Sequence, residues 1–237
     1  MAVFRLDEIL RGSGLYTRRE AIRLVNEGRV TVEGRPAAAI SQRCDSDWDI
    51  RVDGAPVRME PFLCLMLNKP AGYVTATVPG REPPVTDLLE PQYRHLFPVG
   101  RLDLDAEGLL LLTNDGALCH RIIMPDSAIQ KEYYIEVSGR FLPDTRERFR
   151  AGIPVDNGLV CRPADIEIAP DGRSAHVWVT EGKRHQVKRM AAAAGARVRY
   201  LKRLAIGGLR LDAALTPGEY RALTEEELGL IFQKNSR

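Results

Sequence analysis

The sequence predicts an α+β fold in two parts, and two observations predict it. Apolar segments that suit strands do not alternate one for one with segments that suit helices, which argues against a doubly wound parallel sheet. A charged, aperiodic stretch from Pro56 to Phe62, with proline at each side, is typical of a linker. With 237 residues, 44% of them hydrophobic, the chain can build one good core or two modest ones. We therefore expect domains over residues 1–58 and 59–237.

The first part is predicted to contain a helix over residues 18–26. Thr17 and Glu20 match a capping box at its start, and Gly28 closes the periodic stretch. The apolar residues of this helix that can face a core are Ala21, Ile22 and Val25. Two short strands are expected to follow, over residues 29–32 and 50–52.

The larger part is predicted to begin with a buried strand, because FLCLML from Phe62 is a continuous apolar run. A turn, NKPAG, then leads into the β-rich run YVTATV from Tyr73. Further strands are expected over residues 108–112, 132–137, 176–180 and 198–206. Helices are expected after Gly116, over residues 143–150 and 184–194, and from Thr224, whose Glu227 again makes a capping box.

Positive charge is concentrated locally, although the net charge of the chain is only +2. No carboxylate occurs between Glu181 and Asp212, where these basic residues accumulate: Lys183, Arg184, Lys188, Arg189, Arg197, Arg199, Lys202, Arg203 and Arg210. Nucleic acid is the natural partner for such a segment. The alternative is a solvated basic face, but apolar residues interleave with the charges and indicate packed elements.

The cysteines and histidines give no metal-site pattern. The four cysteines form no C-x-x-C pair, and the four histidines are scattered without the spacing of metal ligands. We expect no metal. Neither a cleavable leader nor a long apolar span is present, so we expect a cytoplasmic protein that does not enter a membrane.

The run from Arg5 to Arg35, RLDEILRGSGLYTRREAIRLVNEGRVTVEGR, resembles the S4 RNA-binding module. The resemblance implies a small α/β module that binds RNA. Arg18, Arg19 and Arg23 would supply phosphate contacts, which give affinity without sequence choice. The alternative is that they are ordinary surface charges.

The stretch PVGRLDLDAEGLLLLTNDG, from Pro98 to Gly116, places an arginine and two aspartates in a short turn beside a buried strand. Carboxylates are costly next to an apolar core, although an isolated R-L-D triplet is most often only a turn. GRLD followed by EGLLLLTNDG resembles the pseudouridine synthases of the RsuA type. Three further runs match the same family in the same order: LNKPAG from Leu67, KEYYIEV from Lys131 and EGKRHQVKRM from Glu181.

This resemblance implies a catalytic domain with a largely antiparallel mixed sheet flanked by helices, and it assigns site residues. Asp103 matches the catalytic aspartate, Tyr133 the active-site tyrosine, and Lys188 the basic residue that pairs with the aspartate. Arg101 would organise the turn or fill the space of the displaced base. No cofactor is needed, because the isomerisation is redox neutral and needs no group donor.

RNA would be held by basic and polar residues on both sides of this site. Besides the three S4 arginines, they are Lys69, Lys183, Arg184, His185, Gln186 and Arg189. HQVKRM and the closing IGGLRLD resemble the subgroup that acts on 16S rRNA, so a 16S rRNA or a 30S assembly intermediate is the expected partner of a monomeric enzyme. The alternatives are a synthase for 23S rRNA and a non-catalytic RNA-binding assembly factor.

Overall fold

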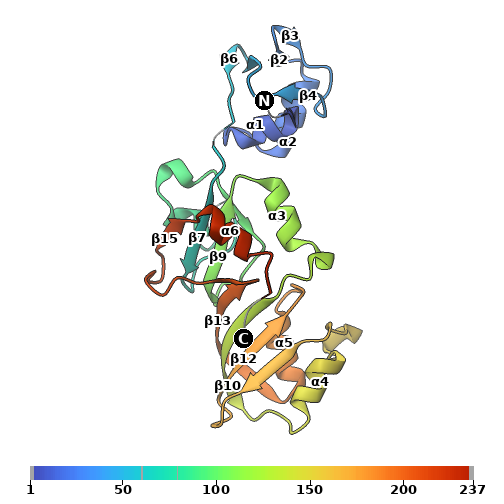
Figure 1. Ribbon diagram of the computed structural model, residues 1–237, viewed down its shortest axis with the longest axis vertical. Coiled ribbons are helices and arrows are strands. Elements are labelled where there is room, and N and C mark those ends of the chain that lie inside the picture. Colours follow the sequence, from blue (N-terminus) through green and yellow to red (C-terminus); the bar gives the residue numbers. More distant parts are fainter. Residues whose placement is uncertain (1–2, 60, 79, 235–237) are drawn as a thin grey trace. The chain divides into compact units, whose positions relative to one another are not determined.

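A computed structural model describes residues 3–59, 61–78 and 80–234 (Figure 1). The chain forms two compact units. One ends at Leu63 and includes Thr113–Gly116, and the other contains the rest of the chain. Within the described residues, no helix is long and apolar enough to cross a membrane.

The first unit combines two helices with short antiparallel strands. Strand β1 pairs with β4, and the other four strands form a sheet in the order β3-β2-β5-β6. The elements are β1 (Val3–Arg5), α1 (Leu6–Gly12), α2 (Arg18–Asn26), β2 (Val30–Val32), β3 (Arg35–Pro36), β4 (Arg43–Asp45), β5 (Ile50–Val52) and β6 (Ala55–Pro56).

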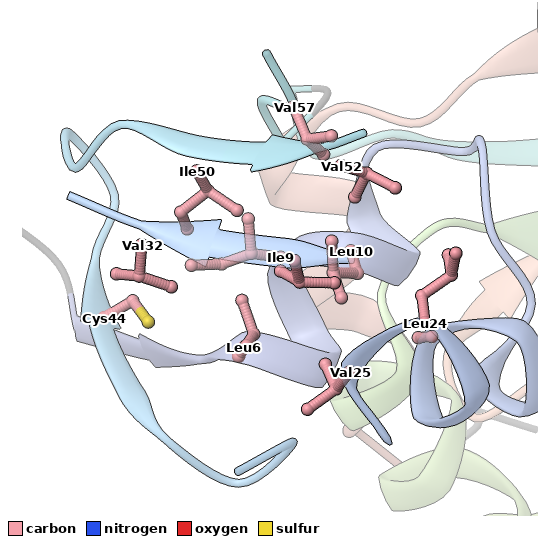
Figure 2. Close-up of a cluster of buried hydrophobic side chains, with 12 residues drawn as sticks. Leu6, Ile9, Leu10, Leu24, Val25, Val32, Cys44, Ile50, Val52 and Val57 are labelled. Carbon is pink, nitrogen blue, oxygen red and sulfur yellow. The ribbon is translucent and has the colours of Figure 1, made fainter. Parts of the chain in front are cut away.

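Helix α2 has the predicted bounds, because the Thr17 hydroxyl accepts from the Glu20 amide and the Glu20 carboxylate accepts from the Thr17 amide. The prediction that Ile22 faces the core is wrong: its side chain is 37% exposed, and Leu24 is buried instead. Figure 2 shows the resulting cluster, in which side chains of both helices meet the inner faces of the strands.

The second unit is a sheet flanked by helices. Its strands are β7 (Cys64–Lys69), β8 (Phe97–Val99), β9 (Glu107–Thr113), β10 (Lys131–Gly139), β11 (Asp165–Ile168), β12 (Ser174–Val179), β13 (Ala196–Ile206), β14 (Leu209–Arg210) and β15 (Tyr220–Ala222). Its α-helices are α3 (Gly116–Ile123), α4 (Thr145–Ala151), α5 (Gln186–Ala193) and α6 (Glu225–Leu230), and short 3-10 turns span Val85–Leu88, Pro91–Tyr93, Pro125–Ser127 and Asp156–Gly158.

The strands of this unit form one nine-stranded sheet in the order β11-β12-β10-β13-β9-β7-β15, with β14 beside β13 and β8 beside β9. The pairs β11–β12, β10–β12, β10–β13 and β7–β15 are antiparallel, whereas β13 and β9 run parallel. Helix α5 contacts β13, and α4 contacts β11. The α+β class with a largely antiparallel mixed sheet is therefore confirmed.

The β-rich run from Tyr73 to Val78 does not form the expected strand. In this part of the described chain, ladder pairing is limited to one bridge between Val74 and Pro84. Thr75 is buried, and its side chain bonds to the backbone of Leu102 instead. The segment therefore supports the loop that carries Asp103.

Candidate active site

A pocket of about 1100 Å³ opens in the second unit and gathers residues of three of its four sequence motifs, those around Asp103, Tyr133 and His185. Its walls come from the loop after β7, the turn before β9, the end of α3, the start of β10, the loop between β12 and α5, and the end of β13. Among the lining residues are Arg101, Asp103, Tyr133, Lys183, Arg184 and His185. We call this cavity the main pocket.

Asp103 presents its carboxylate to two basic side chains from the segment around the start of α5. Its Oδ2 lies 3.4 Å from Nζ of Lys188, and its Oδ1 lies 3.6 Å from Nε2 of His185. The Asp103 side chain is 28% exposed, so substrate can reach it while the surrounding protein still limits its hydration. Lys188 lies closer to Asp105, at 2.5 Å, and thus bridges both aspartates of the turn.

The second carboxylate of the turn, Asp105, has a pKa below its ordinary value. Burial works to raise this pKa, but the hydrogen bond from Lys188 and the positive charge of Lys188 outweigh it. Asp105 therefore stays ionised near neutral pH and anchors the Lys188 ammonium group beside Asp103.

Lys69 lies inside the protein and holds the backbone of the same turn. Its Nζ donates to the carbonyl oxygens of Asp103 at 3.1 Å, Ala106 at 2.7 Å and Pro70 at 3.0 Å. The side chain is fully buried, which lowers its pKa to about 8 although nearby carboxylates oppose the shift. Its ammonium group faces these carbonyls and not solvent, so the geometry does not support the predicted RNA contact of Lys69, which stays a prediction.

Two further contacts fix the Asp103 turn. The Ala106 amide donates to the Asp103 carbonyl at 3.1 Å, which closes the turn itself. The Thr75 hydroxyl donates to the Leu102 carbonyl at 2.8 Å and accepts from the Leu102 amide at 3.1 Å. Sequence reasoning missed Thr75, because nothing in its local pattern indicates a bond to a residue 27 positions away.

Tyr133 and Arg101 both line the main pocket but differ in exposure. Tyr133 lies on β10 and is only 9% exposed, so its ring forms part of the wall. Arg101 is exposed, and within the described residues its side chain makes no hydrogen bond or ion pair. Arg101 is therefore free to move into the pocket, whereas Lys69 and Thr75 organise the turn.

Arg203 and Lys131 add positive charge to the pocket wall; the sequence placed Arg203 in a basic segment expected to hold RNA and gave Lys131 no role of its own. Arg203 is 4% exposed and donates from Nε to the Leu109 carbonyl at 2.7 Å. Its Nη2 is buried without a hydrogen-bond partner in the described part of the chain. Burial, together with the charge of Arg203, lowers the pKa of Lys131 to about 8. Arg203 lies in the strand predicted over residues 198–206 and Lys131 directly precedes the one predicted over 132–137, and only the fold brings them to the pocket.

Gly108 allows β9 to approach β13 beside the pocket. It pairs with Arg203 in the parallel register and has a φ of +96°. A Cβ at this position would lie 2.3 Å from the backbone oxygen of Arg203. Only glycine fits without moving β13.

The residues around the start of α5 that we expected to bind RNA separate into two groups. Arg184 and His185 are exposed and line the pocket, so their proposed RNA contacts stay predictions. Lys183 also lines it, but its Nζ lies 3.1 Å from Glu181. Gln186 is 5% exposed and uses its amide to bond Glu181 and the Lys183 backbone, so the geometry does not support its predicted RNA contact, which stays a prediction.

Two sets of arginines remain as predicted RNA ligands. Arg189 is partly committed, since it contacts the carboxylate of Asp156 at 2.5 Å and its carbonyl oxygen at 3.0 Å. In the first unit Arg18, Arg19 and Arg23 are exposed on α2, and Arg23 lies 3.7 Å from Glu27. Their RNA contacts stay predictions.

Comparisons with known proteins identify both units. The RNA pseudouridylate synthase family matches residues 64–193, and the S4 domain matches residues 4–47. A Bacillus subtilis protein, the uncharacterized RNA pseudouridine synthase YtzG, is 42% identical over 96% of this chain and 98% of its own. The ribosomal small subunit pseudouridine synthase A of Escherichia coli is 38% identical over 96% of this chain and 99% of its own.

A solved structure agrees with the sequence comparisons. A crystal structure of a pseudouridylate synthase superimposes with a TM-score of 0.71 and 31% identity, covering 96% of this chain and 99% of that one. The match extends over both units. The chain therefore belongs to the RNA pseudouridylate synthase family and carries an N-terminal S4 domain.

Proposed function

We propose that this protein converts one specific uridine of 16S rRNA to pseudouridine, with Asp103 as the catalytic nucleophile. The observation that carries the proposal is the position of the Asp103 carboxylate in the main pocket, 3.4 Å from Lys188 and 3.6 Å from His185. A carboxylate can form a transient ester with a substrate carbon and later leave it, which suits a reaction that must first break and then remake a bond.

The isomerisation breaks the N1–C1′ bond of uridine and forms a C5–C1′ bond after the uracil has turned. Asp103 captures one fragment through its carboxylate, at C1′ or C6, or it removes a sugar proton to release the base. The C5 proton must then leave, and N1 must gain a proton. Tyr133 has its ring in the pocket wall, where it can stack on the uracil and pass the C5 proton to water.

The environment of Asp103 suits this chemistry. Lys188 is held at the turn by Asp105, so its positive charge faces Asp103 before substrate arrives. The buried Nη2 of Arg203 has no hydrogen-bond partner in the described chain, so it can donate to an oxygen atom of a bound nucleotide. That hydrogen bond would remove the free-energy cost of leaving the donor buried and unpaired. A pocket of about 1100 Å³ has room for a nucleotide that has left its stack.

The choice of 16S rRNA rests on the relative from Escherichia coli, whose name specifies the small ribosomal subunit. We also propose that residues 1–58 form a module that anchors the RNA, and that residues 59–237 perform the chemistry as a monomer in the bacterial cytoplasm. Exposed arginines on α2 support the first part of this division, because they give affinity without sequence choice.

The proposal is tested by tritium release from 5-tritiated uridine in 16S and 23S transcripts and in subunit particles. Wild-type protein should release tritium from a 16S substrate, and Asp103→Asn should lower the rate by at least about 10⁴-fold. The variant should bind the same RNA as well as wild type, because the substitution preserves the shape of the side chain.

Other outcomes lead to other assignments. Release from 23S substrates alone would assign the large-subunit RNA. Unchanged release by Asp103→Asn would remove Asp103 from the mechanism. Binding of RNA without release from any substrate would favour a non-catalytic assembly factor.

A further inference from the structure

A second large hollow lies at the opposite end of β10 from the main pocket. It is a groove of about 1050 Å³ between the end of β10, the first turn of α4 and the turn that joins β11 to β12. Its cationic lining residues are Arg140, Arg146 and Arg173, and all three are exposed. We call it the distal groove.

These three arginines lack ion-pair partners within residues 3–59, 61–78 and 80–234. Other arginines of α4 behave differently: Arg148 pairs with Asp144 at 2.8 Å, and Arg150 lies 3.6 Å from Asp165. The groove arginines thus keep their charge available for a ligand outside the chain.

The carboxylates of the distal groove do not cancel this charge. The described lining sets two carboxylates against three arginines: Asp171, which accepts from the backbone amide of Arg173 at 2.9 Å, and Glu147. A fourth arginine reaches the rim, since Nε of Arg199 donates to the Ser138 hydroxyl at 3.0 Å. Positive charge therefore dominates the groove.

The rest of the lining offers little that could read a base. It includes Phe141, Leu142, Pro143 and Pro170, and the Thr145 hydroxyl already donates to the Leu142 carbonyl at 2.7 Å. Arginines without neighbouring amide side chains suit the phosphates of a nucleic acid backbone, which carry charge but no sequence information.

We propose that the distal groove binds the phosphate backbone of the substrate RNA at a distance from the modified uridine. Strand β10 connects the two sites, because Tyr133 lines the main pocket and Gly139 lines the groove. Six residues of strand cover about 20 Å. The groove therefore lies several phosphates along the RNA strand from the reacting nucleotide.

This arrangement offsets the cost of extracting the uridine. Removing a base from its stack costs a few kcal/mol, and phosphate contacts away from the chemistry can supply that free energy without touching Asp103. The inference requires only that the chain act on RNA, which its family establishes, and it holds for any ribosomal RNA substrate.

The test compares wild type with the triple variant Arg140→Ala, Arg146→Ala, Arg173→Ala. Binding is measured by fluorescence anisotropy across a salt series, on hairpins with a uridine loop and a stem of about four or about sixteen base pairs. On the long hairpin the variant should bind about tenfold to a hundredfold more weakly, and its plot of log K against log salt should be shallower by about two. On the short hairpin, which does not reach the groove, the two proteins should bind equally.

Controls separate this role from a general loss of charge or fold. Arg148→Ala removes an arginine of the same helix that is paired with Asp144, and it should leave the salt dependence unchanged. The triple variant should keep the melting temperature of wild type.

Three results would overturn the proposal: unchanged binding of the long hairpin, equal weakening on both hairpins, or a lower kcat with unchanged binding. Unchanged RNA binding with loss of polyglutamate binding would instead assign the groove to an acidic protein segment. Tritium release by wild type is scored separately, so failure of the 16S assignment would not be confused with failure of the groove.

Discussion

The two units of this chain use positive charge in opposite ways. The first unit keeps its cations outside: Arg18 and Arg19 are exposed on α2, and its buried cluster is built from apolar side chains (Figure 2). The second unit also buries cations, with Lys69 at 0% and Arg203 at 4% exposure. Burying a charge costs free energy unless hydrogen bonds and partners compensate it.

The difference shows what each charge does. An exposed arginine can contact any phosphate, and its loss weakens binding without disturbing the fold. A buried lysine with three backbone carbonyls within 3.1 Å defines the shape of a turn. In the second unit that turn carries Asp103, so a buried charge there positions the proposed nucleophile.

Lys69→Met should have the largest effect on stability. It leaves the carbonyls of Pro70, Asp103 and Ala106 buried without their donor, so the free energy of unfolding should fall by about 3 to 5 kcal/mol. Tritium release should fall at a temperature where the variant is still folded, because the turn loses its anchor. Urea denaturation and activity on the same sample check both effects, with the exposed Lys234→Met as the matched control. A stable and fully active Lys69→Met protein would contradict the anchoring role.

The position of Lys69 also shows where sequence reasoning stops. The capping box at Thr17 and the motif around Asp103 are local patterns, and both were recognised from the sequence. The acceptors of Lys69 at Asp103 and Ala106 lie 34 and 37 positions along the chain, so no local pattern separates a buried anchor from an RNA ligand. The amide of Gln186 is similarly committed to Glu181 by a loop that sequence spacing does not describe.

Another limit concerns the strands. The run from Tyr73 to Val78 has strand composition, but the Thr75 side chain bonds to Leu102 and no strand forms there in the described chain. The apolar run at β9 was predicted as a strand, yet its parallel pairing with β13 depends on Gly108 and Arg203, which are distant in sequence. Composition therefore predicts which segments are buried better than it predicts what they contact.

Gly108→Ala should be the next most damaging substitution. The new Cβ would lie 2.3 Å from the Arg203 carbonyl oxygen at a φ of +96°, so β13 must shift or the backbone must rearrange. We expect a loss of about 2 to 4 kcal/mol in unfolding free energy, measured by urea denaturation. Gly34→Ala is the control, since its φ is also positive but nothing lies within 4 Å of its Cβ. Equal losses at both positions would show that conformational strain alone, without the clash, explains the effect.

The pH dependence of stability should reveal the half-buried Lys131. Its pKa is about 8 in the folded state, against the ordinary lysine value of 10.5 in the unfolded chain. Between these two pH values the unfolded chain therefore binds more protons than the folded chain. The contribution of Lys131 to the free energy of unfolding therefore becomes more favourable as pH rises from about 8 to 10.5. Relative to Lys131→Met, wild type should gain about 1 to 2 kcal/mol between pH 7.5 and 9.5. Urea denaturation at the two pH values measures the gain, and a constant difference would mean that Lys131 is solvated.

The smallest effect on stability should come from the exposed cations of the first unit. Replacing Arg18, Arg19 and Arg23 by alanine should change the free energy of unfolding by no more than about 0.5 kcal/mol. The same variant should bind RNA more weakly, and the slope of log K against log salt should become shallower by about two, because three phosphate contacts are lost. Arg51→Ala, in which the removed arginine is paired with Asp49 at 2.8 Å, should leave the slope unchanged. A large loss of stability with an unchanged slope would show that these arginines support the fold and do not bind RNA, and the contrast between the two units would then disappear.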